Sequence, residues 1–411
     1  MPDEPILTDL LTRGDRSEVR GSRRVIRTVI KDDSDFYWAL SLPNRDALHE
    51  RLRAAAKAGA VELTWSRQGG ADKTIQIVTL RDTFALARFL GASTTQDDLG
   101  KARDVLLPWL ETSDRLKQII QTWGQRKTVR SLGPSSANYF AEALIVLDAL
   151  NERNGDDQVL RRLSVSLFRD SKRIEKLHRH LDLLTSESLL APARSAAEVF
   201  NQLGLTKEPQ PFLVAGQGTL HLAEKQRCQV LKPFIGVSGK DVTGYQGDPA
   251  WVLTIENLTT FHLCSQMPAA DEGLIIYTGG MPSPSWVRSF TTIVSDLPLD
   301  TPVYHWGDVD VGGFRISAYL RTCLPPERAF LPWMMDLASQ STSEASAADQ
   351  AELNGMKRQA LLSGWLELAE RLVPLTLEQE ALAPTLPNDE RWSTQSELPP
   401  GSEVLIVAES D

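Results

Sequence analysis

The 411-residue sequence has only three cysteines, Cys228, Cys264 and Cys323, and no Cys-x-x-Cys pair. This scarcity excludes a disulfide framework and argues against a structural zinc site. No apolar run approaches the ~20 residues that a membrane-spanning helix requires. The polar start of the chain, with Asp3 and Glu4, shows no sign of a signal peptide. We therefore expect a cytoplasmic protein with reduced thiols and no membrane contact.

The sequence also lacks a Gly-x-x-x-x-Gly-Lys-Ser/Thr loop, so it has no P-loop ATP site. Internal repeats and heptads are missing as well. The hydrophobic content of 42% is that of an ordinary globular protein. A chain of this length is long enough for two or three domains.

An excess of positive charge is missing too, since the formal net charge is −10. Residues 337–411, however, hold four Lys/Arg against thirteen Asp/Glu, so the rest of the chain is close to neutral. Two basic segments stand out there, residues 13–31 and 161–179. Nucleic-acid binding depends on such local patches more than on the total charge. The first segment is predicted to be an arm or a helix with a basic face, with a solvated surface as the alternative.

Three apolar runs predict buried strands, at residues 251–255, 274–277 and 302–306. Helical patterns follow each of them after short connections. This alternation predicts parallel strands with right-handed crossovers. Glu256 ends the first strand, and Asp308 and Asp310 follow the third, so all three should lie at one edge of the sheet.

Asp308 and Asp310 should lie on one face because side chains alternate along an extended chain. Two carboxylates held this close repel each other, and a divalent cation relieves the repulsion. With Glu256 they form a candidate Mg²⁺ or Mn²⁺ site, which would be both the metal site and the catalytic site. Gly312 and Gly313 permit close approach of a phosphate or of backbone. The alternative for an isolated Asp-x-Asp is a turn or a helix cap.

The second basic segment predicts a helix, a short turn near Asp170 and a basic helix, which is the layout of a helix-turn-helix. Residues 212–214 and 219–222 flank a Gly-rich turn and are predicted to form its wing. The alternative is an inert surface helix. The candidate DNA-binding residues are Arg161, Arg162, Arg169, Lys172, Arg173 and Lys176.

The N-terminal part predicts a helix at residues 46–58, strands at 61–65 and 74–80 with a turn at 68–72, and another helix from Asp82. A helix followed by a hairpin is how a winged helix ends. We expect this unit to contact protein, or protein and DNA. Residues 99–154 read as helices and 351–371 as a helical extension. From Pro384 onward the sequence predicts a poorly ordered acidic tail.

Glu256 after one strand and Asp308-Val309-Asp310 after a later one resemble the signature of the Toprim domain, the metal-binding module of topoisomerases, bacterial primases and related nucleases. A closer resemblance is to the JetD family, the Toprim subunits of Wadjet anti-plasmid systems. The segments that carry it are residues 163–172, 233–237, 255–261, 277–280 and 305–310. The likeness covers roughly residues 155–335.

The resemblance implies a multi-domain α+β protein, with a helical and winged-helix N-terminal region followed by an α/β Toprim domain that has a mainly parallel sheet. We expect an N-terminal arm, helices and a winged-helix-like unit in residues 1–150, and a basic helix-turn-helix or winged helix of the CAP-like type in 151–230. The Toprim domain would cover 231–340, and a helical extension with an acidic tail 341–411.

The resemblance also implies a metal-dependent endonuclease that hydrolyses double-stranded plasmid DNA as a homodimer. An SMC-like complex of an ATPase, a kleisin and an accessory subunit would deliver the DNA. Related transesterases and type IIB topoisomerases instead cut with a tyrosine in the winged helix. None of the six tyrosines lies in residues 158–185, although the fold could place Tyr139 or Tyr245 at the site. A non-catalytic DNA-binding or bridging protein is the other alternative.

Overall fold

The computed structural model describes residues 4–22, 24–31, 35–66, 74–153, 156–337 and 345–387. They divide into two compact units, residues 1–145 with 180–191, and residues 146–179 with 192–411. Helices α7 (Ala137–Asn151) and α9 (His178–Thr185) contribute to both. The expected mixture of helices and strands, with several sheets, is confirmed. No helix in the described part of the chain is long and apolar enough to cross a membrane.

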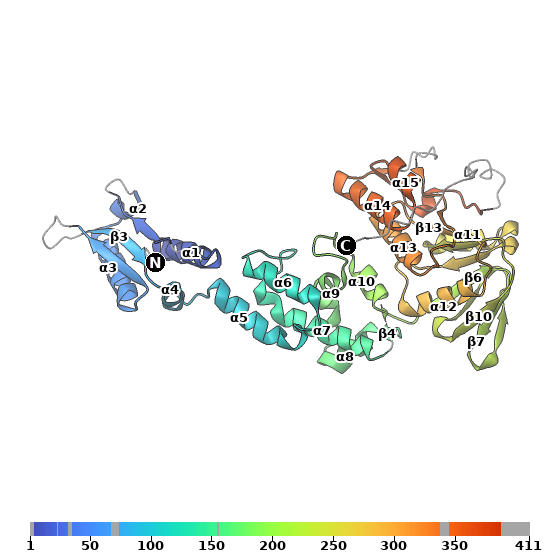
Figure 1. Cartoon of the computed structure of the whole chain (residues 1–411), viewed down its shortest axis with the longest axis horizontal. Coiled ribbons are helices and arrows are strands. Elements are labelled where there is room, and N and C mark those ends of the chain that lie inside the picture. The colour runs from blue at the N-terminus through green and yellow to red at the C-terminus, as the bar shows by residue number, and fades with distance from the viewer. Residues whose placement is uncertain are drawn as a thin grey trace, which may run out of the picture. The chain divides into compact units, whose positions relative to one another are not determined.

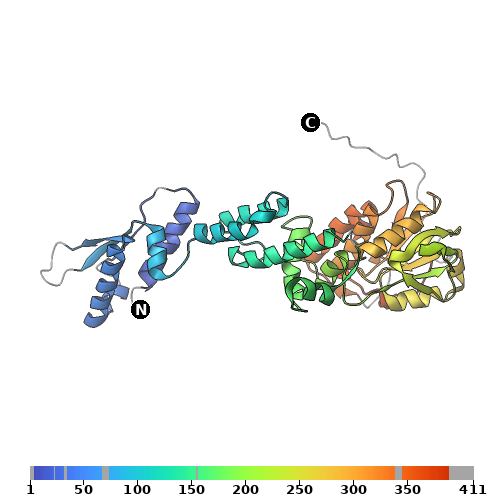
Figure 2. The ribbon, with the colours of Figure 1, turned by 90° about the horizontal axis from the view of Figure 1, so that it is seen from below.

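The first unit begins with a three-stranded antiparallel sheet in the order β1-β3-β2, which appears in blue with its helices in Figures 1 and 2. Helix α3 and strands β2 and β3 confirm the predicted helix and two strands, whereas the turn predicted at 68–72 lies outside the described residues. Asp82 caps α4, as its side chain accepts from the Ala85 amide. The elements are α1 (Glu4–Val19), β1 (Arg27–Val29), α2 (Asp35–Trp38), α3 (Leu42–Lys57), β2 (Val61–Trp65), β3 (Ile75–Leu80), α4 (Thr83–Leu90), α5 (Thr95–Leu106) and α6 (Asp114–Gly124).

The second unit is built around a six-stranded mixed sheet in the order β14-β13-β11-β12-β6-β9. The pairs β11–β12, β11–β13 and β13–β14 are parallel, and β6 pairs antiparallel with β12 and β9. The strands are β6 (Pro211–Gly216), β9 (Ile235–Ser238), β11 (Val252–Ile255), β12 (Leu274–Tyr277), β13 (Val303–Trp306) and β14 (Phe330–Pro332). The three strands predicted from apolar runs are therefore confirmed.

The helices that follow β11, β12 and β13 also lie where their sequence patterns predicted them. They are α11 (Leu258–Ser265), α12 (Pro284–Ser295) and α13 (Val311–Thr322). Helices α14 (Gln350–Leu362) and α15 (Leu366–Arg371) form the extension. One continuous apolar core includes the sheet, these helices and the extension. The yellow-to-red part of Figure 1 shows these elements.

The prediction that residues 212–214 and 219–222 form a wing is wrong. Strand β6 belongs to the six-stranded sheet, whereas β7 (Thr219–Leu222) pairs with β8 (Arg227–Gln229) and β10 (Val242–Gln246) in a separate one. Gly216 and Gly218 have positive φ values, so the chain changes direction between β6 and β7 without pairing them. Tertiary pairing with β12 has overridden a local hairpin pattern.

The remaining short elements are β4 (Gln158–Val159), α8 (Leu160–Phe168), α10 (Ala196–Gln202), β5 (Leu205–Thr206), β15 (Ser346–Ala347) and β16 (Leu375–Thr376). The prediction of a poorly ordered tail from Pro384 onward is wrong for its first residues. Thr385 and Leu386 are buried, and the Trp333 indole donates to the Thr385 carbonyl at 3.2 Å. Residues 388–411 lie outside the described part.

Candidate metal centre

Glu256 and Asp308 leave adjacent parallel strands at the same edge of the sheet. The register pairs Ile255 of β11 with Trp306 of β13, so both chains end their strands at one level. The Asp308 amide donates to Glu256 Oε2 at 3.2 Å, which joins the two strand ends directly. The apolar runs of β11 and β13 end here because burying a charged carboxylate in the apolar core is costly.

Burial raises the pKa of Glu256 to about 8, and the nearby Asp308 charge adds to the shift. Burial likewise raises the pKa of Asp308 to about 6, although the Gln379 amide donates to its Oδ1 at 2.8 Å. Asp310 is the N-cap of α13, where its Oδ1 accepts from the Gly313 amide at 2.7 Å. Asp310 therefore caps the helix through Oδ1, and its Oδ2 takes no part in that hydrogen bond.

Two glycines allow this loop to pack so closely. A Cβ on Gly313 would lie 2.2 Å from the Asp308 carbonyl oxygen, and one on Gly307 would lie 3.0 Å from Glu256 Oε2. The sequence predicted that a phosphate or backbone lies close to the glycines. At Gly313 the group that approaches is the backbone of Asp308. His305 is fully buried, and a hydrogen bond of 2.9 Å joins its Nδ1 to the Thr254 hydroxyl. Burial lowers the pKa of His305 to about 3, so its ring is neutral.

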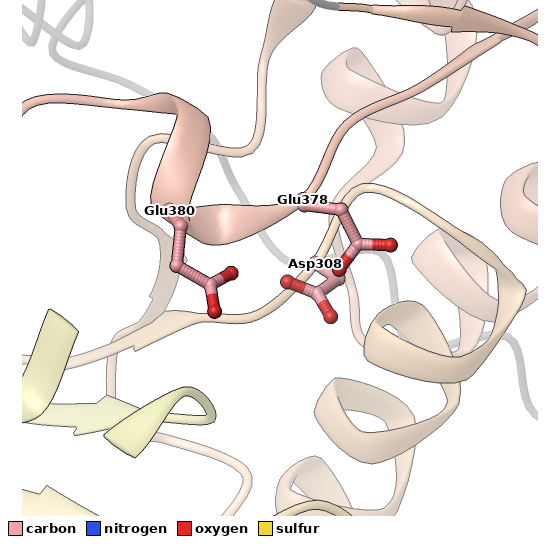
Figure 3. Close-up of side chains that lie close together, drawn as sticks. All are labelled: Asp308, Glu378 and Glu380. Carbon is pink, nitrogen blue, oxygen red and sulfur yellow. The ribbon is translucent and has the colours of Figure 1, made fainter. Parts of the chain in front are cut away.

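Two further carboxylates that the sequence reasoning missed complete the acidic group. Asp308, Glu378 and Glu380 have carboxylate oxygens that all lie within 4.8 Å of one another, and Figure 3 shows the three groups close together. They line a cleft of about 480 Å³ together with Asp310. Glu256 and Asp310 line a second cleft of about 730 Å³, so Asp310 borders both. The sequence signal was the alternation Glu-Gln-Glu, which lies in a segment assigned to the extension.

Residues 375–381, which we call the bridging segment, place Glu378 and Glu380 there. Leu377 and Val309 exchange backbone hydrogen bonds of 2.8 and 3.2 Å. The fully buried Gln379 accepts from the Asn257 amide at 2.7 Å and donates to the Trp306 carbonyl at 2.9 Å. Gln379 therefore holds the loop after β11 and the loop after β13 in one arrangement.

The donor set fits Mg²⁺ or Mn²⁺, because these ions prefer carboxylate oxygens. Within the described residues, no Lys or Arg forms an ion pair with any of these carboxylates. They are Glu256, Asp308, Asp310, Glu378 and Glu380. By contrast, the neighbouring Glu198 is paired with Arg315. Among the described residues, the cluster therefore receives no charge compensation from a basic side chain.

The six candidate DNA-binding residues lie around one turn of the second unit. Arg161 and Arg162 are in α8, Arg169, Lys172 and Arg173 lie in or beside the turn, and Lys176 is in a 3₁₀ helix (Ile174–Leu177) that leads into α9. Asp170 accepts from the Lys172 amide at 2.8 Å, as expected of a capping residue. All six are exposed except Arg173, which is half-buried. Arg161 forms an ion pair with Glu175 and Lys176 with Asp170, and neither partner belongs to the carboxylate cluster.

The raised pKa of Glu256 predicts that Glu256→Gln stabilises the metal-free protein at high pH. The folded chain holds this proton up to about pH 8, whereas the unfolded chain loses it near the ordinary value of 4.5. Stability should therefore fall as pH rises through that window, and the variant should lack this fall. In a chelator, we expect the variant to melt a few degrees above wild type at pH 8.5 and close to it at pH 4.5.

Melting curves at both pH values check this, since 1 kcal/mol shifts the midpoint by roughly 2–4 °C in domains of this size. Adding Mn²⁺ at pH 8.5 should raise the wild-type midpoint more than that of the variant. A difference between the two proteins that does not change with pH would show that Glu256 is not held in a poorly solvated acidic site.

The part of the chain that carries these carboxylates resembles a known protein family. Residues 222–386 match the family model described as the C-terminal part of Wadjet protein JetD. The chain is also 23% identical over 317 residues to Wadjet protein JetD of Bacillus cereus (strain Q1), covering 72% of this chain and 74% of that relative. The matched region contains the sheet edge with Glu256 and Asp308 and the bridging segment. Both comparisons thus confirm the resemblance to the JetD family that the motifs indicated.

Proposed function

We propose that the chain is the metal-dependent DNA endonuclease subunit of a Wadjet-type anti-plasmid system. The observation that carries this proposal is the group of carboxylates without basic partners at the ends of β11 and β13. The parallel strands β11, β12 and β13, with Glu256 after the first and Asp308 after the last, support a Toprim domain here. The sheet β1-β3-β2 with α3 and α4 supports a winged-helix-like unit in the first unit.

In this proposal Glu256, Asp308 and Asp310 hold Mg²⁺ or Mn²⁺, and Glu378 and Glu380 add oxygen donors beside Asp308. The cation supplies Lewis-acid polarisation of the scissile phosphate and neutralises charge on the leaving oxygen. Glu256 and Asp308 must release their protons to bind it. The α13 cap fixes Asp310, and Gln379 fixes Asp308. The residues Arg161, Arg162, Arg169, Lys172, Arg173 and Lys176 bind DNA phosphates.

A two-fold dimer would supply the two sites that cutting both strands requires. The similarity to Wadjet protein JetD supports assembly with further subunits, which we propose to be an SMC-like ATPase, a kleisin and an accessory protein. These partners would deliver closed circular DNA to the carboxylate edge.

Hydrolysis, rather than attack by a tyrosine, should produce the break. Burial and the Glu256 carboxylate raise the pKa of Tyr277, so this tyrosine near the acidic edge stays protonated and is a weak nucleophile. The buried hydroxyl of Tyr245 donates to the Gln217 carbonyl at 2.9 Å. We therefore expect cleaved DNA to carry free ends.

The test uses the complete complex, closed circular plasmid and Mg²⁺ or Mn²⁺. Linear product should enter a gel without protease treatment, and end-labelled DNA should separate from denatured protein. If label stays with denatured protein, the tyrosine alternative holds, and mapping the adduct would identify Tyr139, Tyr245, Tyr277 or another residue. Intact plasmid that is nevertheless bound or looped would support the non-catalytic bridging alternative.

A further inference from the structure

The basic segment at residues 13–31 forms a cleft in the first unit that the proposed nuclease site does not use. Its volume is about 750 Å³, and it lies between the end of α1 and the beginning of β1. The arginines that line it are Arg13, Arg16, Arg20, Arg24 and Arg27. We call it the arginine cleft. Arg23 lies outside the described residues.

Four of these arginines have no acidic partner among the residues that the structure describes. Arg16, Arg20, Arg24 and Arg27 are exposed, and in the described part of the chain their guanidinium groups form no ion pair. Arg13 differs, because it pairs with Asp9 at 3.3 Å. Four uncompensated charges facing one cleft create a positive potential that attracts anions.

None of the described acidic side chains of α1 lines the arginine cleft. Asp15 is buried, pairs with Arg126, and accepts from the amide of Thr95 at 2.9 Å and from its hydroxyl at 2.7 Å. Asp9 is paired with Arg13, and Glu18 is not among the residues that line the cleft. None of the lining residues is acidic.

Backbone contacts hold the two sides of the cleft in place. Gly21, with φ of +63°, reverses the chain after α1, and the Ser22 amide donates to the Ser17 carbonyl at 2.9 Å. The Arg13 guanidinium donates to the Arg27 carbonyl at 2.7 Å and so ties α1 to β1. The hydrogen bond between Arg13 and Arg27 therefore joins the two elements that carry the arginines, which lowers the entropy cost of binding a ligand.

We propose that the arginine cleft binds the phosphate backbone of double-stranded DNA, as a second contact besides that of residues 161–179. This inference rests on the proposed function for its ligand. Guanidinium groups donate in pairs to phosphate oxygens, and the hydroxyls of Ser17 and Ser22 also line the cleft. No aromatic side chain lines it, whereas protein partners are usually anchored by such residues. DNA is thus favoured over an acidic protein segment.

The test is binding of the full chain to a short labelled duplex, measured by fluorescence anisotropy over a range of salt concentrations. All proteins carry Asp308→Asn and Asp310→Asn and are kept free of metal, so that no cleavage is needed. Each lost phosphate contact lowers the slope of log affinity against log salt by ~0.9. Replacing Arg16, Arg20, Arg24 and Arg27 with Ala should lower the slope by about 2 to 4 and weaken binding to all sequences alike.

Three further variants make the result specific. Lysine at the same four positions should keep most of the slope, which separates lost charge from lost folding. Alanine at four exposed basic residues elsewhere in the unit, Arg88, Lys101, Arg103 and Lys127, should change the slope by less than one contact. Arg169→Ala with Lys172→Ala and Arg173→Ala tests the contact in the proposed function separately.

An unchanged slope for the four-alanine variant, with a wild-type circular dichroism spectrum, would overturn the proposal. If that variant instead loses an acidic protein partner, the cleft is a protein-binding site and the proposal is also wrong. A lowered slope for the four-alanine variant, together with no cleavage by the complete wild-type complex in the plasmid test, would keep the arginine cleft and reject the nuclease. The two proposals therefore fail independently.

Discussion

Asp308→Asn combined with Asp310→Asn should abolish plasmid cleavage while leaving the protein folded. Asparagine still accepts from the Gln379 and Gly313 amides, and it caps a helix as well as aspartate does. The variant therefore removes two negative charges from the cluster and little else. Losing several kcal/mol of electrostatic stabilisation would lower the rate by roughly 1000-fold, since ~1.4 kcal/mol is a factor of ten.

The measurement is linearisation of closed circular plasmid by the complete complex, with melting curves to confirm folding. Asp300→Asn with Glu327→Gln is the matched control, because it removes two charges at exposed positions of the same unit. The control should cleave normally. Wild-type cleavage by the Asp308/Asp310 variant would reject the site assignment.

Gln379→Ala should weaken divalent-cation binding although Gln379 is not a predicted ligand. The change removes the side-chain bonds to the Asn257 amide and the Trp306 carbonyl. The Asn257 amide then has no partner in this arrangement, which costs about 1–3 kcal/mol for a buried group. Alanine keeps the backbone amide that donates to Asp308, but without its two side-chain hydrogen bonds the bridging segment would hold Asp308, Glu378 and Glu380 less firmly. Lost support of this kind typically lowers metal affinity 10–100-fold.

Calorimetric titration with Mn²⁺ checks this prediction, and Gln350→Ala, at an exposed glutamine of α14, is the control. Gln379→Glu gives a second readout. It keeps the oxygen for Asn257 but places another oxygen toward the Trp306 carbonyl, so its affinity defect should grow with pH as the carboxyl ionises. Equal affinities for Gln379→Ala and Gln350→Ala would show that Gln379 does not position the site.

The strands beside the site could be predicted from the sequence because each depends on residues that are contiguous in the chain. Contiguous apolar runs indicated the strands β11, β12 and β13. Glu256 and Asp308 lie just after two of these runs, so their positions at the strand ends could also be predicted. Pairing between distant segments was not predictable in the same way. The β6 and β7 segments have the local pattern of a hairpin, yet β6 pairs with β12. Because short strands take their partners from tertiary packing, local propensity could not reveal this.

Glu378, Gln379 and Glu380 were missed for the same reason. They come from a segment whose composition matches a solvated acidic extension. What brings it to the site is a set of long-range bonds to Asn257, Trp306 and Asp308. The sequence thus predicted a site with three carboxylates, whereas the structure gathers Asp308 with two others. The predicted roles of Glu256, Asp308 and Asp310 as metal ligands stay predictions.

The distance along the chain between Asn257 and Gln379 also orders events during synthesis. The bridging segment leaves the ribosome 122 residues after the loop that it holds. At 5–20 residues per second, this delay is roughly 6–24 s. During that time the nascent chain has both strand-end loops but not the residue that joins them, nor Glu378 and Glu380. If the proposed nuclease needs the bridging segment to position its carboxylates, it would become active only after synthesis had passed that segment.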